Sequence, residues 1–180
     1  MVAGDQEGIK MSNYNITPEG TEDILLSWKI FRIVYRNGKA KVWELASPSR
    51  GFIWYEREAT ALHENNVLHT NKRQLVECFN TEFHCGIYSY KLSKLAKTKT
   101  KVFNYFVREA YYELGHIGQV DAIGIISSKG LVLESTHGFR SESARIESIY
   151  LNSEYLFGNE LTKAQASLME KYHVPVEIRK

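Results

Sequence analysis

Residues 23–47 read DILLSWKIFRIVYRNGKAKVWELAS, and this stretch decides the fold class. Two runs rich in β-branched and aromatic residues flank Asn37-Gly38, a pair that favours a type I′ turn because both positions tolerate positive φ. The pattern therefore predicts a hairpin with strands near residues 24–36 and 40–46. The sequence GFIWYEREA at 51–59 predicts a third strand after a turn.

Further along the chain, strand patterns alternate with short helical ones. FHCGIYSY at 83–90 predicts a strand, and QVDAIGIISSKGLVLES at 119–135 predicts a second hairpin closed by Ser128-Lys129-Gly130. ARIESIYL at 144–151 and VPVEI at 174–178 predict two more strands. Because the strands follow one another locally without a βαβ rhythm, their order predicts antiparallel pairing.

Three helices are expected between these strands. Asn71 is placed to cap a short helix, and apolar residues from Val102 follow helical spacing up to a stop at Gly115. Thr162 and Gln165 form a capping-box pair that would open a helix ending near Tyr172. The predicted fold class is therefore α+β, with a mostly antiparallel sheet or small barrel and two or three flanking helices.

The composition is that of one globular domain. The chain has 180 residues, of which 43% are hydrophobic and 24% charged, with a net charge of +2. We expect a flexible leader at residues 1–20 and a single domain at 21–180. With no export signal and no apolar stretch of the ~20 residues that a membrane helix needs, we predict a cytoplasmic protein without membrane association.

Cys85, in the stretch TEFHCGIYSYK, admits three interpretations: a nucleophile, a zinc ligand or a buried apolar residue. His84 cannot serve it as a base on an unbroken strand, because adjacent side chains point to opposite faces. Zinc is disfavoured because six residues separate Cys78 from Cys85 and no Cys-x-x-Cys pair exists. We expect a buried, inert thiol, no metal and no cofactor.

Two polar segments are the candidate binding regions. KLSKLAKTKTK at 91–101 carries five lysines and no acid, so it either contacts phosphates or forms a solvated face. ESTHGFRSESAR at 134–145 includes Arg140, which can bind a phosphate or carboxylate through two parallel hydrogen bonds. Alternatively, an arginine–glutamate pair in this segment bridges two strands. The candidate ligand-binding residues are Tyr88, Lys91, Lys94, Lys97, His137, Arg140, Glu142 and Arg145.

The segments at 85–91, 118–146 and 169–176 together resemble a family of small uncharacterised bacterial and phage-encoded proteins. Its first motif is matched by Cys85, Gly86, Ile87 and Tyr88. Its second, Gly-aromatic-Arg-Xaa-Glu-Xaa-Ala, is matched by Gly138, Phe139, Arg140, Glu142 and Ala144. Members often carry His-Ala-Pro and a second cysteine before the first motif, which this chain lacks. The resemblance implies a fold and marks positions, but implies no reaction.

Signatures of common enzyme classes, such as a P-loop, a dinucleotide fingerprint or HExxH, are missing from the sequence. We therefore predict a non-catalytic binding module for nucleic acid or a phosphorylated small ligand. One alternative is a protein–protein adaptor or inhibitor, which phage could encode. Another is an enzyme that uses Cys85 or the group of His137 and Glu142.

Overall fold

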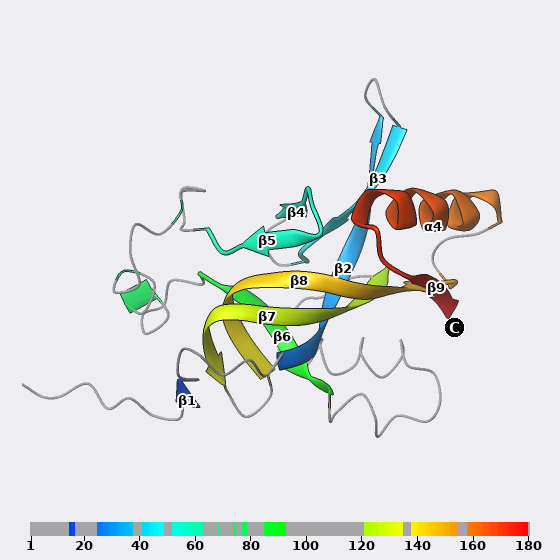
Figure 1. Ribbon diagram of the computed structural model, residues 1–180. Helices are drawn as coiled ribbons and strands as arrows, with labels where there is room; N and C mark the ends of the chain where they lie inside the picture. The colour runs from blue at the N-terminus through cyan, green and yellow to red at the C-terminus, as the bar shows by residue number, and fades with distance from the viewer. Residues whose placement is uncertain are drawn as a thin grey trace, which may run out of the picture.

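The computed structural model of the chain describes the segments that carry most of the expected strands (Figure 1). The described residues are 15–16, 25–37, 41–48, 52–62, 68, 74, 77–78, 85–92, 121–134, 138–154 and 158–179.

Strands dominate the described residues, and α4 is the one full helix that occurs among them. The prediction of an α+β fold with two or three flanking helices is therefore wrong: the fold is sheet-dominated, and its sheet is mixed because β8 and β9 pair in parallel. The elements are β1 (Asn15–Ile16), β2 (Leu25–Asn37), β3 (Lys41–Ala46), β4 (Ile53–Trp54), β5 (Glu58–Thr60), β6 (Ile87–Lys91), β7 (Ala122–Glu134), β8 (Gly138–Asn152), α4 (Asn159–Tyr172) and β9 (Val176–Arg179).

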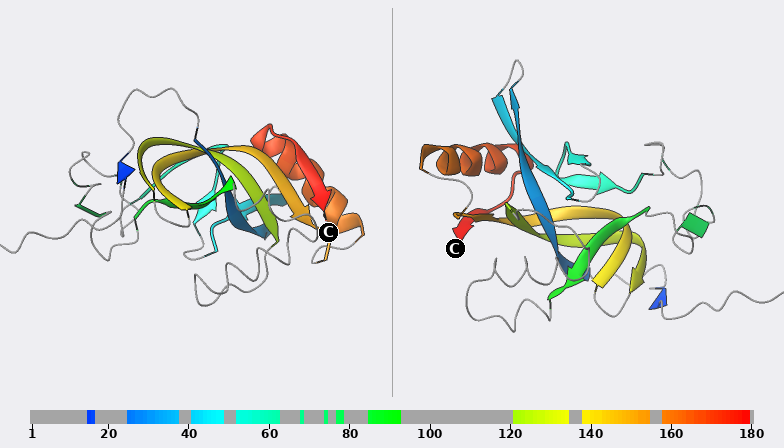
Figure 2. Two further views of the ribbon diagram at one scale, coloured as in Figure 1. Left: turned by 90° about the horizontal axis from the view of Figure 1, so that it is seen from below. Right: turned by 180° about the vertical axis from the view of Figure 1, so that it is seen from behind.

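The predicted hairpin of β2 and β3 is confirmed. The two strands pair antiparallel from Arg32 opposite Ala46 to Asn37 opposite Lys41, and the turn between them lies outside the described residues. Figures 1 and 2 show both strands extending beyond the rest of the sheet. The strand predicted at 51–59 is present as two short strands, β4 and β5, separated by a bend.

The second predicted hairpin, closed at Ser128-Lys129-Gly130, is wrong. β7 continues through these residues and pairs instead with β8, which begins at Gly138. Gly130 has a φ of 73°, and the register shifts between Lys129 and Val132. Because glycine adopts positive φ without a steric penalty, the expected turn residues make a bend within one long strand.

This bend lets four strands close into a ring. The first half of β7 pairs with β2, whereas the first residues of β8 pair with β6. β6 also pairs with β2, through Ser27 opposite Lys91 and Trp28 opposite Tyr90. We call β2, β7, β8 and β6 the strand ring. Figure 2 shows the curvature of β7 and β8, two of its members. Its inner face carries Ser27, Lys29, Phe31, Ile87, Ser89 and Ile126.

The main hydrophobic core lies between this inner face, β3, β4 and α4. Phe31, Leu45, Trp54 and Tyr172 are all buried in it. The rings of Phe31 and Trp54 meet edge to face at a centroid distance of 5.3 Å, a favourable aromatic geometry. The core thus joins the ring to the hairpin and to the helix.

Helix α4 begins earlier than predicted. Its N-cap is Gly158 and has no side-chain hydrogen bond, so the capping box expected at Thr162 and Gln165 does not form. Gln165 instead donates from Nε2 to the Val176 carbonyl at 2.7 Å, which ties the helix to β9. The helix ends at Tyr172 as predicted, followed by His173 in the left-handed conformation.

Several expectations fall on segments that the structure describes only in part. Within the leader expected at 1–20, Asn15 and Ile16 pair with Glu134 and Leu133 of β7. Residues 74, 77 and 78 are helical, in line with the short helix expected after Asn71, whereas the helix expected from Val102 lies outside the described residues. None of the described helical segments has the length and apolar character needed to cross a membrane.

Candidate functional site

Arg140 and Tyr88 lie directly opposite each other on β8 and β6. Arg140 is buried, and its guanidinium carbon is 5.1 Å from the centroid of the half-exposed Tyr88 ring. Its Nε donates to the Cys85 carbonyl, and Nη2 donates to the Cys78 carbonyl at 3.4 Å. These contacts make Arg140 a cross-link between the start of β6 and the segment at Cys78, with its donors directed into the protein.

Both cysteines are buried free thiols that pack with Leu133. The expected burial of Cys85 is therefore confirmed, at 1% exposure. Within the described part of the chain, no group of three or more His, Cys, Asp and Glu side chains could hold a metal ion. His84 lies outside that part.

The remaining predicted residues are dispersed. Lys91 forms an ion pair of 2.5 Å with Glu134 and lies 5.7 Å from the Phe139 ring centroid. Glu142 accepts a hydrogen bond of 3.0 Å from the Leu131 amide beside the bend of β7. Lys94, Lys97 and His137 lie outside the described residues. The predicted set therefore forms no single site among the residues that are placed.

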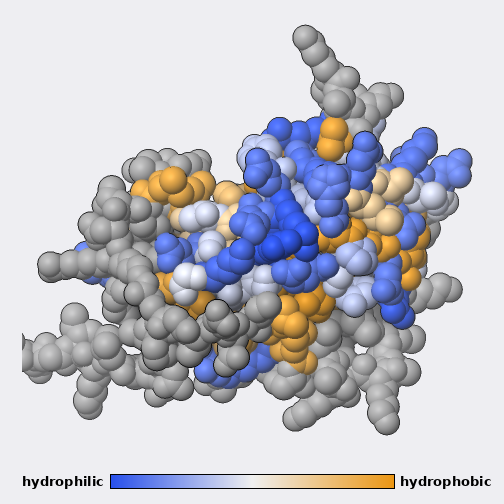
Figure 3. All heavy atoms as spheres, in the orientation of Figure 1, coloured by the Kyte–Doolittle hydropathy of each residue, from blue (hydrophilic) through white to orange (hydrophobic). Residues whose placement is uncertain are grey.

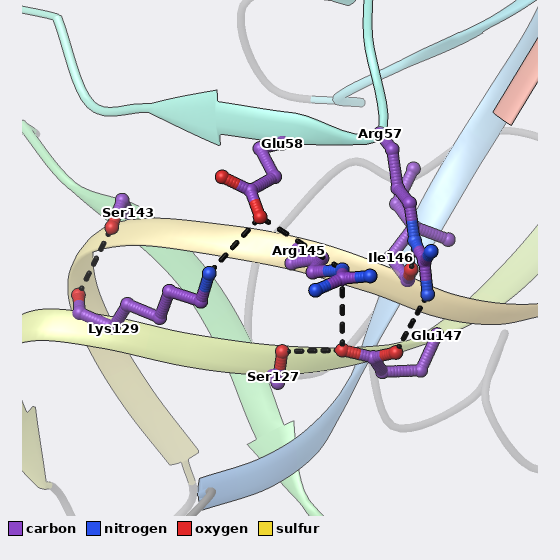
Figure 4. Close-up of polar contacts among 8 residues, drawn as sticks. All are labelled: Arg57, Glu58, Ser127, Lys129, Ser143, Arg145, Ile146 and Glu147. Carbon is purple, nitrogen blue, oxygen red and sulfur yellow. Dashed lines mark hydrogen bonds and ion pairs between the residues drawn. The ribbon is translucent and has the colours of Figure 1, made fainter.

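Arg145 belongs to a separate charge network on the outer face of β5, β7 and β8 (Figure 4). Its Nε lies 3.8 Å from a carboxylate oxygen of Glu58 and 4.0 Å from one of Glu147. Lys129 donates to Glu58 at 3.0 Å, and this hydrogen bond, with the lysine charge, lowers the pKa of Glu58. We call Arg57, Glu58, Lys129, Arg145 and Glu147 the outer network.

The outer network fixes β5 onto the sheet. Arg57 donates from Nε to the Ile146 carbonyl at 2.9 Å and from Nη2 to Glu147 at 3.0 Å, while Ser127 donates to Glu147 at 2.6 Å. Figure 3 shows hydrophilic side chains gathered over this part of the surface. Because its three basic groups face two acidic ones at short range, most of its positive charge is neutralised locally.

Residues 32–46, which comprise the paired parts of β2 and β3 and the sequence between them, have a different charge balance, and we call this stretch the hairpin arm. It contains four basic residues and one acidic residue, for a net charge of +3. The rest of the chain contains 19 basic and 20 acidic residues, for a net charge of −1. The excess positive charge of the protein is therefore concentrated in the arm.

Exposed arginine and tyrosine side chains lie on the arm and next to it. Arg32 and Arg36 share one face of β2, and both are exposed. Arg36 donates to the Tyr55 hydroxyl at 3.1 Å, and its guanidinium carbon is 5.2 Å from that ring centroid. Tyr55 itself is 59% exposed. Among the described residues Arg32 forms no ion pair, whereas Arg36 pairs with Glu44 at 2.9 Å.

Helix α4 holds the base of the arm in position. The Tyr172 hydroxyl accepts a hydrogen bond from the Leu45 amide at 3.0 Å and donates one to the Trp54 carbonyl at 2.6 Å. Burial, the largest cause, raises the pKa of Tyr172 to about 12. Lys171 pairs with Glu44 at 2.5 Å, and Ser167 accepts a hydrogen bond from the Trp43 amide at 3.3 Å. We call these contacts the helix clamp.

No protein-family model matches the chain, and searches of curated proteins and of solved structures find no significant match.

Arg32, Arg36 and Tyr55 were not among the candidates drawn from the sequence. The signal was the local charge balance of the arm, which is visible in the printed sequence but is obscured by the hydrophobic alternation of the hairpin. The contact of Tyr55 with Arg36 depends on the pairing of β3 with β4, which local patterns do not specify.

Proposed function

We propose that this protein is a non-catalytic binding module for nucleic acid and that the hairpin arm is its contact surface. The observation that carries the proposal is the pair of exposed arginines, Arg32 and Arg36, on one face of an arm with a net charge of +3. Residues four apart on a strand are separated by about 13 Å, so the two side chains would meet different phosphates.

The aromatic residues beside these arginines support the same proposal. Proteins that bind single strands combine positive charge along the backbone with aromatic side chains on which bases stack. Tyr55, which contacts Arg36, is 59% exposed, and Tyr35, the neighbour of Arg36 along β2, is 43% exposed on the opposite face of the strand. Arg36 already lies over the Tyr55 ring, which is the cation–π arrangement that also favours stacking of a base on either group.

The proposal is tested by fluorescence anisotropy with single-stranded and double-stranded oligonucleotides at two salt concentrations. The slope of log affinity against log salt concentration is negative, and each lost phosphate contact makes it less steep by about 0.7–0.9. We expect this change for Arg32→Gln. Lys163→Gln is the matched control, because Lys163 is exposed on α4 and also loses one charge.

Tyr55→Ala distinguishes stacking from charge. We expect it to weaken binding of single strands by about 1–3 kcal/mol and to leave the salt slope near its wild-type value. If wild type binds no oligonucleotide, or if Arg32→Gln and Lys163→Gln behave alike, the proposal fails. Binding of a protein partner would then favour the adaptor hypothesis.

A further inference from the structure

The inner face of the strand ring contains a lysine that has no acidic partner among the described residues. Lys29 on β2 is 8% exposed, and its Nζ donates one hydrogen bond of 3.0 Å to the Tyr88 carbonyl. The Phe31 ring centroid is 5.9 Å away. Among the described residues, no carboxylate lies within ion-pair distance of Nζ. Lysine is almost never fully buried unless it is paired, so this environment needs an explanation.

Buried serine hydroxyls share this face with Lys29. Ser27 lies two residues before it on β2, and Ser89 lies on β6, one residue before Tyr90, which pairs with Trp28. The two side chains are 0% and 4% exposed, and neither Oγ has a hydrogen-bond partner among the described residues. Alternation along the strands directs all three side chains to the same side. Each hydroxyl can donate one hydrogen bond.

A second lysine lies at the rim of the same face. Lys91 is opposite Ser27 on β6 and is therefore a diagonal neighbour of Lys29, roughly 7–8 Å away along the sheet. It pairs with Glu134, and both side chains are partly exposed, at 26% and 38%. Among the described residues, the inner face thus offers two cations and two hydroxyl donors without a partner, and Glu134 is the carboxylate at its exposed rim.

We propose that the inner face of the strand ring binds a small anion, a carboxylate or phosphate group, through the Lys29 ammonium and the Ser27 and Ser89 hydroxyls. An anion would supply the missing counter-charge and would accept the unused N–H and O–H donors. Burial lowers the pKa of Lys29 to about 8, so the side chain is still mainly charged at neutral pH. This site is separate from the hairpin arm and does not depend on nucleic-acid binding.

Thermal unfolding in the presence of inorganic phosphate or acetate, at matched ionic strength, tests the proposal. When the free anion is present at ten times its Kd, the Tm of wild type should rise by about 3–5 °C. Lys29→Met keeps most of the length of the side chain without its charge and should lose this rise. Ser89→Ala changes little volume and should reduce the rise, which keeps the test decisive if Lys29→Met folds poorly.

A control variant separates this site from other anion effects. Lys163→Met removes an exposed lysine of α4 and should keep the wild-type rise in Tm. The larger response to phosphate or to acetate identifies the preferred anionic group. No rise with either anion, or an equal rise in wild type and in both Lys29→Met and Ser89→Ala, would overturn the proposal.

Discussion

The helix clamp and the inner face of the strand ring bury polar groups in opposite ways. In the clamp, the Tyr172 hydroxyl both accepts from Leu45 and donates to Trp54, so its hydrogen-bonding capacity is used. On the inner face, Lys29 makes one hydrogen bond, and the Ser27 and Ser89 hydroxyls make none with described residues. Among the described residues, the clamp therefore satisfies its buried hydroxyl, whereas the inner face leaves buried donors without a hydrogen-bond partner.

This difference indicates where binding can occur. Buried polar groups are normally paired, and each exception needs a specific reason. Natural proteins depart from local rules mainly at functional positions and compensate for the cost elsewhere. The buried core and the clamp can supply such compensation for Lys29, which has no carboxylate partner among the described residues.

The largest loss of stability is expected from adding a side chain at Gly138, where β8 lies close to β6. A Cβ added at Gly138 would lie 2.0 Å from the Ser89 carbonyl oxygen, a backbone atom that cannot move without displacing β6. Gly138→Ala should therefore lower the free energy of unfolding by about 4 kcal/mol or more, as measured by urea denaturation.

Gly158→Ala is the matched control. Its added Cβ meets no atom within 4 Å, and its only cost is a φ of 56°, which is roughly 1–2 kcal/mol. If both substitutions lower the free energy of unfolding equally, the close approach of β6 to β8 at Gly138 does not limit the residue at this position.

Tyr172→Phe removes both hydrogen bonds of the clamp and leaves the Leu45 amide and the Trp54 carbonyl without that partner. A loss of about 2–4 kcal/mol in the free energy of unfolding is expected. Tyr35→Phe, at a 43% exposed tyrosine, should change it by less than about 0.5 kcal/mol. A loss as small at Tyr172 as at Tyr35 would show that the clamp contributes little.

The same tyrosine gives the clamp a signature at high pH. The folded-state pKa of Tyr172 is about 12, above its ordinary value of 10.0. Between these values the unfolded chain has lost the phenolic proton and the folded protein still holds it. Stability should therefore fall from about pH 10 to pH 12 in wild type, and this component should be absent in Tyr172→Phe.

Lys29→Met should change the free energy of unfolding in the opposite direction to Tyr172→Phe. The pKa of Lys29 is about 8 in the folded protein against an ordinary 10.5, so the charged form is disfavoured by folding. In the absence of anions, the substitution should raise the free energy of unfolding at pH 7 by about 1–3 kcal/mol. A decrease instead would mean that Lys29 stabilises the fold.

The pH dependence of wild type checks the same point. Between pH 8 and 10.5 the unfolded chain keeps the Lys29 proton that the folded protein has released, so stability should rise with pH. The groups facing Lys29 are the Tyr88 carbonyl, the Phe31 ring and, at the rim, the pair of Lys91 and Glu134. This rise should be missing in Lys29→Met.

The smallest effect is expected in the outer network. Glu58 and Lys129 are each at least half exposed, and ion pairs of this kind contribute less than about 1 kcal/mol. Glu58→Gln should therefore lower the free energy of unfolding only slightly, and 1 M salt should remove the difference. A loss comparable to that of Tyr172→Phe would make the outer network as important as the clamp.

The sequence predicted the hairpin and the end of α4 because these features depend on neighbouring residues. Runs of β-branched and aromatic residues on both sides of Asn37-Gly38 predicted β2 and β3, and the helix expected to open at Thr162 and Gln165 was predicted to end near Tyr172. The sequence did not predict the ring, because a turn signal such as Ser128-Lys129-Gly130 is satisfied equally by a reversal or by a bend. The pairing of β7 with β2, which is distant in sequence, and with the whole of β8, which follows it, decided between the two.

Site residues were harder to predict for the same reason. Arg140 looked available in a polar loop, but its pairing opposite Tyr88 buries its guanidinium. Lys29 was not among the candidates drawn from the sequence, and it lies on the same face of β2 as Phe31. A charged residue in the apolar register of a strand was the one signal available for this position.

The most direct test of the unneutralised inner face is the pKa of Lys29 itself. It can be measured by carbon-13 NMR of the lysine ε-methylene, with Lys29→Met providing the assignment. We predict a pKa near 8 in anion-free buffer and an increase when phosphate is added, because a bound anion favours the charged form. A pKa near 10.5 without anion, or a value that phosphate does not change, would contradict the account.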